Sequence, residues 1–399
     1  MTDSTTAKPT PDGLAFWAPS IPIRQDGSPV RLDAGPRERS LARLIAIALN
    51  ARGKRTVPVL PTLKTQQGTV WVASGSAWAL DQALKAPEVP GCRFVAWGRA
   101  DLSAPQPSAW RVELWVADRQ RGVQLAYAWF RGEDAAEGSA VRSLIHSILP
   151  PIWKAVVGED SLGQAEIDAL FANLMGEARP TDERAVAMLE GLDVLDSITK
   201  GVRLVDPKKA LEVFRLARGA QPAHGPLGRL ELEAALRGAL AGALPLDLCR
   251  QAVADLLQSA PDLPRGRAAA AELALRAGDA PGAIELATPV ARLAEPREAA
   301  IGEELLGRAY EATKEISQAA AAFRRAVKHD PRRSVSWTYL GYFAAQLGKW
   351  DEAEVCYTQA AALAPQDASL QEALKRVRGE LIKVREARGP LVPPPAESA

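Results

Sequence analysis

Few residues of this chain combine the types and the spacing that catalysis or metal binding requires. The histidines are His146, His224 and His329, and none lies near a second histidine or a cysteine at the spacing of a zinc site. The sequence lacks the phosphate-binding pattern G-x-x-x-x-G-K-[ST], a G-x-G-x-x-G after a strand, and the G-x-S-x-G of a nucleophile elbow. We therefore expect no enzymatic activity, no catalytic residue, no metal and no cofactor.

Length and composition limit the number of domains, the class of partner and the compartment. The chain has 399 residues, which is too long for one ordinary core, so two or three domains are expected. The formal net charge of +1 favours neither nucleic acid nor an anionic membrane as a general partner. The N-terminus has no signal-peptide pattern, no apolar run is long enough to span a membrane, and the three cysteines are far apart. These features predict a cytoplasmic protein with reduced thiols.

The elements that organise the chain lie near its C-terminus, where one pattern occurs twice. Between residues 300 and 367 the matching residues are 34 positions apart: Leu306-Gly307 and Leu340-Gly341, Ala319 and Ala353, Phe323 and Tyr357, Ala326 and Ala360, Pro331 and Pro365. The small residues allow two helices to approach closely, the aromatic residues fill the seam, and each proline ends a second helix. The second copy also opens with Trp337.

This pattern resembles the tetratricopeptide repeat, a helix-turn-helix unit of 34 residues that stacks on its neighbours. The resemblance implies protein recognition in a groove lined by the first helix of each unit. By position in the repeat, the groove residues are Ile301, Glu304, Arg308, Glu311, Val335, Thr338, Tyr342 and Gln346, with Ala312 and Ala345 beside them. Solvated side chains with no binding role are the alternative for each position.

The groove residues also indicate the kind of partner. Repeats that bind the carboxylate of a chaperone tail need Lys and Asn at the fifth and ninth positions of the unit. Here Glu304 and Thr338 occupy the fifth position, and Arg308 and Tyr342 the ninth, which argues against that subclass. A mixed, aromatic-containing groove suits a peptide or a helix that makes both apolar and charged contacts. No nucleic acid and no membrane partner is expected.

More helices are expected upstream, because a single unit cannot bury its apolar face alone. Residues 160–299 have helical spacing typical of divergent repeats, with pairs near 226–241 and 246–259 and near 265–277 and 281–293. Asp206-Pro207 has the pattern of a helix start, and the helix after it matches the second helix of a repeat. Residues 368–388 are predicted to form a capping helix and 389–399 a disordered tail.

Residues 13–158 are predicted to form an α/β domain after a disordered arm at 1–12. The expected elements are an edge strand in 13–23, helices at 37–51, 76–84 and 141–149, strands at 56–60 and 92–97, and a hairpin of 110–118 with 123–130. Gly98 is expected to close one strand and Pro150-Pro151 to stop the last helix. The predicted fold is a mixed sheet with an antiparallel hairpin and packed helices, followed by an all-α solenoid.

Most tryptophans of this domain are predicted to be core residues or cross-strand neighbours. For Trp115 and Trp129 the alternative is a place on an exposed face, where each would anchor an interface. The segments 94–102 and 110–132, whose turn carries Asp118 and Gly122, look like the N-terminal α/β domain of TolB and are similar to CsgG-type assembly proteins. Some bacterial regulators join such a domain to tetratricopeptide repeats. The chain lacks the propeller, the winged helix and the lipoprotein signal of these relatives, so their export and DNA-binding functions do not carry over.

Three hypotheses about function follow. The first is a non-enzymatic bacterial adaptor that binds proteins in the groove of its repeats, with the α/β domain as a second docking platform. The second is a regulatory protein whose α/β domain senses a small molecule or another subunit. The third is a component that acts beside an assembly apparatus of the cell envelope.

Overall fold

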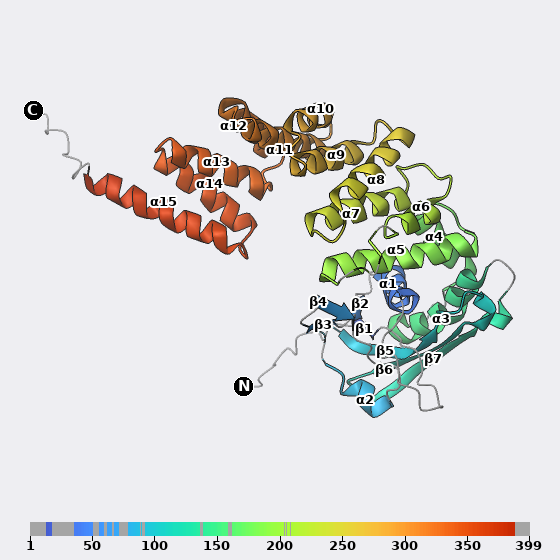
Figure 1. Cartoon of the computed structure of the whole chain (residues 1–399). Coiled ribbons are helices and arrows are strands. Elements are labelled where there is room, and N and C mark those ends of the chain that lie inside the picture. Colours follow the sequence, from blue (N-terminus) through green and yellow to red (C-terminus); the bar gives the residue numbers. More distant parts are fainter. Residues whose placement is uncertain are drawn as a thin grey trace, which may run out of the picture. The chain divides into compact units, whose positions relative to one another are not determined.

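The computed structural model contains two compact units, Met1–Ala252 (unit 1) and Val253–Ala399 (unit 2) (Figure 1). The described residues are 13–17, 36–50, 56–59, 62–65, 68–71, 79–87, 89, 92–135, 139–158, 162–202, 204, 206, 207 and 209–387. The predicted arm at 1–12 and the predicted tail at 389–399 lie outside them.

Unit 1 contains a mixed five-stranded sheet with the strand order β2-β1-β5-β6-β7. Its strands are β1 (Gly13–Trp17), β2 (Thr56–Val59), β5 (Cys92–Asp101), β6 (Arg111–Asp118) and β7 (Val123–Arg131). β1 runs parallel to β2 and β5, whereas β5, β6 and β7 are antiparallel neighbours. A hairpin of β3 (Thr62–Thr65) and β4 (Gly68–Trp71) forms a separate two-stranded sheet. The predicted mixed sheet with its antiparallel hairpin is confirmed.

β1 lies between two neighbours, so the prediction of an edge strand in 13–23 is wrong. That prediction depended on Pro19 and Pro22, because a proline cannot donate a hydrogen bond to a neighbouring strand. The strand ends at Trp17, before either proline. Residues 14–16 pair on both sides, and Trp17 pairs with Val59 of β2.

Gly98 lies inside β5, so the prediction that it closes this strand is also wrong. It faces Leu114 on β6 in the antiparallel register. A Cβ atom at position 98 would overlap the Glu113 carbonyl oxygen and the Leu114 side chain. Glycine at this position therefore permits a close approach of two strands rather than ending one.

Helices α1 (Pro36–Asn50) and α3 (Ala140–Val157) pack on one face of the sheet (Figure 1). Their apolar stripes share one core with the side chains of β1, β5, β6 and β7 that point to that face. The short helix α2 (Leu80–Leu84) packs near Val95 and Trp97, whose side chains point to the opposite face. Part of the predicted helix at 76–84 lies outside the described residues.

α3 runs through Pro150 and Pro151, where the sequence predicts that the helix stops. Each proline removes one backbone donor from the helix. The helix nevertheless continues because the turn after the prolines buries Ile152, Trp153 and Val156 in the core of unit 1. Burial of these side chains outweighs the lost hydrogen bonds.

Helix α5 (Asp182–Lys200) packs against α1 through a row of ion pairs. The buried Arg39 donates hydrogen bonds of 2.6 and 2.9 Å to the carboxylate of the buried Asp193. Two further pairs, Arg37 with Glu190 at 2.9 Å and Arg43 with Asp196 at 2.6 Å, flank this contact. Together with α4 (Gln164–Met175), α5 extends the core of the sheet into the helical part of unit 1. The predicted domain limits at 158, 299, 367 and 388 stay predictions.

Helix α6 (Glu212–Arg218) begins later than the Asp206-Pro207 pair predicts. The Asp206 carboxylate accepts a hydrogen bond from the backbone N–H of Lys209 at 3.4 Å, and the chain makes turns before the helix starts. An Asp-Pro pair initiates a turn as readily as a helix, and here the turn is formed. The prediction of a helix start at this pair is therefore wrong.

α5 and α6 nevertheless meet as two helices of a repeat unit do. A Cβ atom on Gly191 would lie 2.7 Å from Cε1 of Phe214, and a Cβ atom on Gly307 would lie 2.8 Å from Cε1 of Phe323. Phe214 follows Gly191 by 23 residues (214 − 191), whereas Phe323 follows Gly307 by 16 (323 − 307). The longer connection explains why the upstream pair is out of phase with the 34-residue period.

The helices after α6 follow the predicted pairs. They are α7 (Pro226–Leu240), α8 (Leu246–Ser259), α9 (Pro264–Arg276), α10 (Ala280–Ala291), α11 (Pro296–Ala312), α12 (Ile316–His329), α13 (Ser334–Gln346), α14 (Trp350–Leu363) and α15 (Ala368–Ala387). α8 spans the division between the two units, and α9 to α15 belong to unit 2. α15 covers the last hairpin with Leu370, Leu374 and Val377.

Candidate functional site

The two hairpins α11–α12 and α13–α14 are built by the residues that repeat in the sequence. Gly307 lies against the ring of Phe323, and Gly341 lies against the ring of Tyr357. Trp337 packs against the same apolar cluster as Tyr357, so the opening tryptophan and the seam aromatic belong to one core. The repeat pattern thus describes real contacts between neighbouring helices.

Two of the predicted groove residues are held in ion pairs within unit 2. Arg308 on α11 pairs with Glu272 on α9, with one of its hydrogen bonds at 3.0 Å. Glu304 on α11 is buried and accepts hydrogen bonds of 3.0 Å from Arg333 and 2.8 Å from the Ser336 hydroxyl. These charged side chains join successive first helices, and their main contacts are within the chain.

The exposed groove positions lie on α13. The side chains of Val335 and Tyr342 are 42% and 44% exposed, and Gln346 is exposed one turn beyond Tyr342. Thr338 is half-buried and its hydroxyl donates to the Ser334 carbonyl oxygen at 2.8 Å. The spacing of these residues places them on one face of the helix, where an apolar partner surface can reach them.

The remaining groove positions lie on α11 and contribute less surface. Ile301 is half-buried and packs against the apolar cluster that α9, α10 and α11 share. Glu311 is half-buried, and Ala312 is exposed at the end of α11. Ala345 on α13 is half-buried in the neighbouring cluster.

Tyr339, which the sequence reasoning did not select, lies between the two sets of groove residues. Its ring stacks on that of Phe323 with 4.6 Å between the centroids and 7° between the planes. Burial and the nearby Glu311 carboxylate raise the pKa of the Tyr339 hydroxyl. Burial alone would lower the pKa of Arg308, but its hydrogen bonds to Glu272 raise it above the ordinary value. Both groups therefore keep their protons throughout the physiological pH range.

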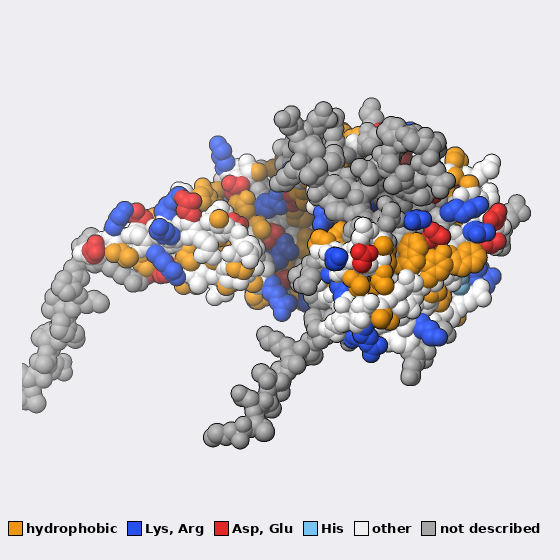
Figure 2. Space-filling model, turned by 90° about the horizontal axis from the view of Figure 1, so that it is seen from below, with side chains coloured by type: hydrophobic (Ala, Val, Ile, Leu, Met, Phe, Trp, Pro, Cys, Tyr) orange, Lys and Arg blue, Asp and Glu red, His pale blue; other side chains and the backbone are white. Residues whose placement is uncertain are grey.

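The sheet of unit 1 exposes a second surface of mixed character, on the face opposite α1 and α3. There Trp129 is 50% exposed, which makes the prediction of a core position wrong for this tryptophan, whereas Trp97 and Trp110 are buried as predicted. Trp115 is half-buried between the rings of Trp97 and Tyr127, at centroid distances of 6.2 and 5.5 Å. In Figure 2, hydrophobic side chains gather on the underside of unit 1 with Lys and Arg side chains beside them.

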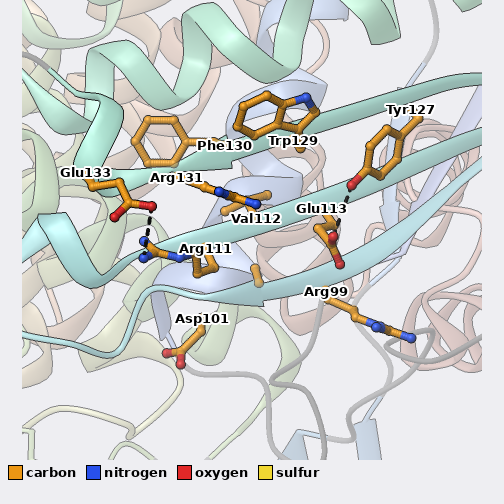
Figure 3. Close-up of a pocket in the computed structure, with 11 residues that line it drawn as sticks. Arg99, Asp101, Arg111, Val112, Glu113, Tyr127, Trp129, Phe130, Arg131 and Glu133 are labelled. Carbon is orange, nitrogen blue, oxygen red and sulfur yellow. Dashed lines mark hydrogen bonds and ion pairs between the residues drawn. The ribbon is translucent and has the colours of Figure 1, made fainter.

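An open pocket of about 570 Å³ lies on this sheet face (Figure 3). The Tyr127 hydroxyl donates to the Glu113 carboxylate at 3.0 Å, and Arg111 lies 3.5 Å from Glu133. Arg111 and Arg131 are directly opposite each other in the β6–β7 register. Two like charges at such a cross-strand position are unfavourable, and the Glu133 carboxylate beside Arg111 offsets part of this cost.

His146 is partly buried beside Arg142 and Asp168, and burial together with the Arg142 charge lowers its pKa. Within the described part of the chain, no group of three or more His, Cys, Asp or Glu side chains is placed to hold a metal ion. No helix among the described residues has the length and the hydropathy for crossing a membrane.

Comparison with known families identifies the repeats directly. Tetratricopeptide-repeat models match residues 304–333 and 335–367. The chain contains tetratricopeptide repeats. These two segments coincide with the hairpins α11–α12 and α13–α14, so the period, the packing and the family match agree. The fold is thus an α/β domain followed by a tetratricopeptide-like helical solenoid, as predicted from the sequence.

Solved structures of other tetratricopeptide proteins are similar to parts of this chain. A thermophilic repeat protein of Thermus thermophilus, TTC0263, is 22% identical with a TM-score of 0.33, over 39% of this chain and 84% of that one. MamA of Desulfovibrio magneticus RS-1 is 16% identical with a TM-score of 0.36, over 47% and 98%. The Sgt2 repeat domain of Aspergillus fumigatus is 17% identical with a TM-score of 0.29, over 35% and 91%. No curated protein sequence matches the chain. These likenesses are too distant to carry information about function.

The position of a residue within the repeat does not predict the ion-pair partners of Glu304 and Arg308. Arg333 lies 29 residues after Glu304, and Glu272 lies 36 residues before Arg308, so neither pair is at the 34-residue offset. In the sequence, these pairs could have been predicted only from residues of opposite charge that lie about one repeat apart.

Proposed function

We propose that this chain is a non-enzymatic adaptor that binds a partner protein along the first helices of its tetratricopeptide repeats. Repeats of this family bind proteins in general, and two units of this chain match the family. The observation that carries the proposal is the exposed row of Val335, Tyr342 and Gln346 on α13. A partly exposed valine and tyrosine on one helix face provide apolar anchors for a peptide or helix.

The charges in the groove refine the expected partner. Since Glu304 and Arg308 already bind Arg333 and Glu272, a partner gains little by pairing with them. Recognition should then depend on apolar contact with Tyr342 and Val335, with Gln346 as a polar contact beside them. A short amphipathic helix or extended peptide with one or two apolar anchors fits this surface.

Site-specific photo-crosslinking of the full-length chain tests the proposal. A benzophenone amino acid at position 342 should yield a protein adduct in cells, and the same amino acid at Val355 should not. Val355 is the matched control because it is 60% exposed but lies on the second helix, α14. Tyr342→Ala should then weaken binding of the captured partner by about tenfold, the range of a side chain that anchors an interface. Equal adducts from positions 342 and 355, or none from either, would contradict the proposal.

A second candidate function is supported by the pocket on the sheet of unit 1. The opposed Arg111 and Arg131 beside Trp129 form a surface that suits a small planar anion, so the domain would sense a ligand. Thermal denaturation of the full-length chain with a panel of nucleotides and aromatic carboxylates tests it. Stabilisation that Arg131→Gln abolishes would support a sensor, and the absence of any stabilisation would remove this candidate.

The α/β domain also serves as a second docking platform in this proposal. Its resemblance to the TolB N-terminal domain and to CsgG-type proteins, a role beside an envelope apparatus and the cytoplasmic location stay predictions. The crosslinking experiment bears on the location as well, because a captured partner of known compartment would place the adaptor there.

A further inference from the structure

Glu311 is the charged groove position that the ion pairs of unit 2 leave unmatched. It lies in the last turn of α11 and is half-buried. Glu304 and Arg308 on the same helix are each held by an opposite charge. Within the described part of the chain, Glu311 forms neither an ion pair nor a hydrogen bond. Its carboxylate is therefore the groove charge on α11 that an incoming partner can still pair with.

The basic residues nearest to Glu311 along the chain do not neutralise it. Arg308, three residues earlier, directs both of its terminal guanidinium nitrogens to Glu272 on α9. Lys314, three residues later, lies beyond the last residue of α11 and has a left-handed backbone with a φ of 66°. Side chains three residues apart meet on the surface of a continuous helix, and α11 ends before Lys314.

The Glu311 carboxylate lies near the Tyr339 hydroxyl of the next first helix, α13. Burial raises the pKa of this hydroxyl, the Glu311 and Glu272 carboxylates raise it further, and the Arg308 guanidinium lowers it. Two carboxylates and one guanidinium thus act on the same point of the groove, which leaves one negative charge in excess. A partner that excludes water from this point would strengthen the attraction for a cation.

Tyr339 connects this excess charge to the exposed apolar row of α13. Its ring is held by stacking on Phe323, at 4.6 Å between the centroids. Tyr342 follows Tyr339 by three residues, so the two side chains are neighbours on the surface of the helix. Because Tyr342 is 44% exposed, a partner that contacts its ring also brings side chains close to Glu311.

The charges next to Tyr342 on its other side are already matched. Arg376 on α15 occupies the position of Tyr342 one unit later, by the 34-residue offset. It pairs with Glu372, four residues earlier on the same helix, at 3.4 Å. α13 itself contains no charged residue. The unmatched charge beside the exposed apolar row is therefore negative.

We propose that the partner carries a lysine or arginine beside the apolar side chain that contacts Tyr342, and that this cation pairs with Glu311. The inference rests on the proposed function, because it concerns the same groove, and it adds the charge of the partner. The cation would also lie near the rings of Tyr339 and Tyr342, and aromatic faces attract cations. A carboxylate at the same place would meet Glu311 as a like charge, so the groove discriminates against acidic partners.

Selection of displayed peptides on the full-length chain tests the inference. The probe is a library of random peptides about twelve residues long, and the peptides kept are those that bind the wild type but not Tyr342→Ala. These peptides should contain Lys or Arg within about four residues of an apolar side chain. Synthetic copies should bind Glu311→Gln about tenfold more weakly than the wild type. Glu285→Gln is the matched control, because it removes an exposed carboxylate from a second helix, α10, and it should leave the affinity unchanged.

A charge exchange separates direct pairing from an indirect effect of the substitution. A peptide whose basic residue is replaced by Glu should bind the wild type about tenfold more weakly than its parent, and Glu311→Lys should recover this loss. An exchange that recovers nothing would overturn the inference.

Two further outcomes distinguish this inference from the proposed function. Peptides that need Tyr342 but carry no basic residue, or that bind Glu311→Gln as tightly as the wild type, would overturn the inference and leave the groove proposal standing. If the selection yields no peptide that depends on Tyr342, the proposed function fails and the inference fails with it.

Discussion

The close contact between Gly307 and Phe323 allows a sharp test of the packing in the repeats. A helical glycine replaced by alanine normally gains about 1 kcal/mol from helix propensity. At position 307, however, the new Cβ atom would lie 2.8 Å from both Cε1 and Cζ of Phe323. The ring cannot move away freely, because it is fully buried and stacks on Tyr339. Gly307→Ala should therefore destabilise the α11–α12 hairpin.

The magnitude follows from two opposing effects. Overpacking a buried side chain costs about 1–3 kcal/mol, and the propensity gain offsets about 1 kcal/mol of this. We expect a net loss of up to about 2 kcal/mol in the opening free energy of α11 and α12. Hydrogen exchange of the full-length chain, followed by mass spectrometry on peptides from these two helices, measures this quantity locally.

The chain provides a matched control in Gly379 on α15, where an added Cβ atom would meet nothing within 4 Å. Gly379→Ala should stabilise α15 by about 0.5–1 kcal/mol, as expected for a helical site with room for a Cβ atom. Phe323→Leu should rescue Gly307→Ala, so that the double variant is at least about 1 kcal/mol more stable than the sum of the single effects predicts. If Gly307→Ala instead stabilises its helix as much as Gly379→Ala does, the reasoning about the close contact is refuted.

Three further predictions concern unit 1. Burial raises the pKa of the Asp196 carboxyl to about 6 despite its ion pair with Arg43, and the nearby Asp193 adds to the rise. The folded state therefore binds this proton more tightly than the unfolded state does. As the pH rises from about 4 to about 6 the carboxyl loses its proton, and the free energy of unfolding falls by about 2–3 kcal/mol in total. The stability of Asp196→Asn relative to the wild type should rise over that range in denaturant titrations, and a difference that is independent of pH would contradict the assignment. Asp193→Ala should cost about 3 kcal/mol because it removes two hydrogen bonds from the buried Arg39, whereas Arg39→Met combined with Asp193→Leu should cost less; equal losses would argue against a buried charge effect. Gly98→Ala should lower the thermal midpoint of the sheet, seen by tryptophan fluorescence, since its Cβ atom overlaps the β6 backbone; an unchanged midpoint would show that β5 and β6 lie further apart.

Much of the repeat architecture could be predicted because its contacts are local in the chain. Gly307 and Phe323 lie in the same helical hairpin, and the same spacing returns at Gly341 and Tyr357. Periodicity alone therefore locates both helices and the seam between them. The equivalent contact of Gly191 with Phe214 could not be found in this way, because a longer connection breaks the phase.

The sheet was predictable in its strands but not in its order. Alternation of apolar residues locates β5, β6 and β7 and shows that β6 and β7 form a hairpin. No local pattern states that β1 lies between β2 and β5, since this depends on pairing between distant segments. For the same reason Trp97 and Trp129, which have similar sequence surroundings, differ in exposure: α2 covers the region of Trp97, and Trp129 lies on the edge strand.

The sequence by itself determined the 34-residue unit, the residues in its seam and the family to which its repeats belong, because each of these depends on side chains close together along the chain. Only the tertiary structure decided which of the predicted groove positions are exposed and which are held in ion pairs within the chain. Glu304 and Arg308 have the right positions in the repeat, but residues 29 and 36 positions away bind them. A charged side chain pairs with the opposite charge that the fold brings within about 3 Å of it. The separation of two residues along the chain does not predict that distance.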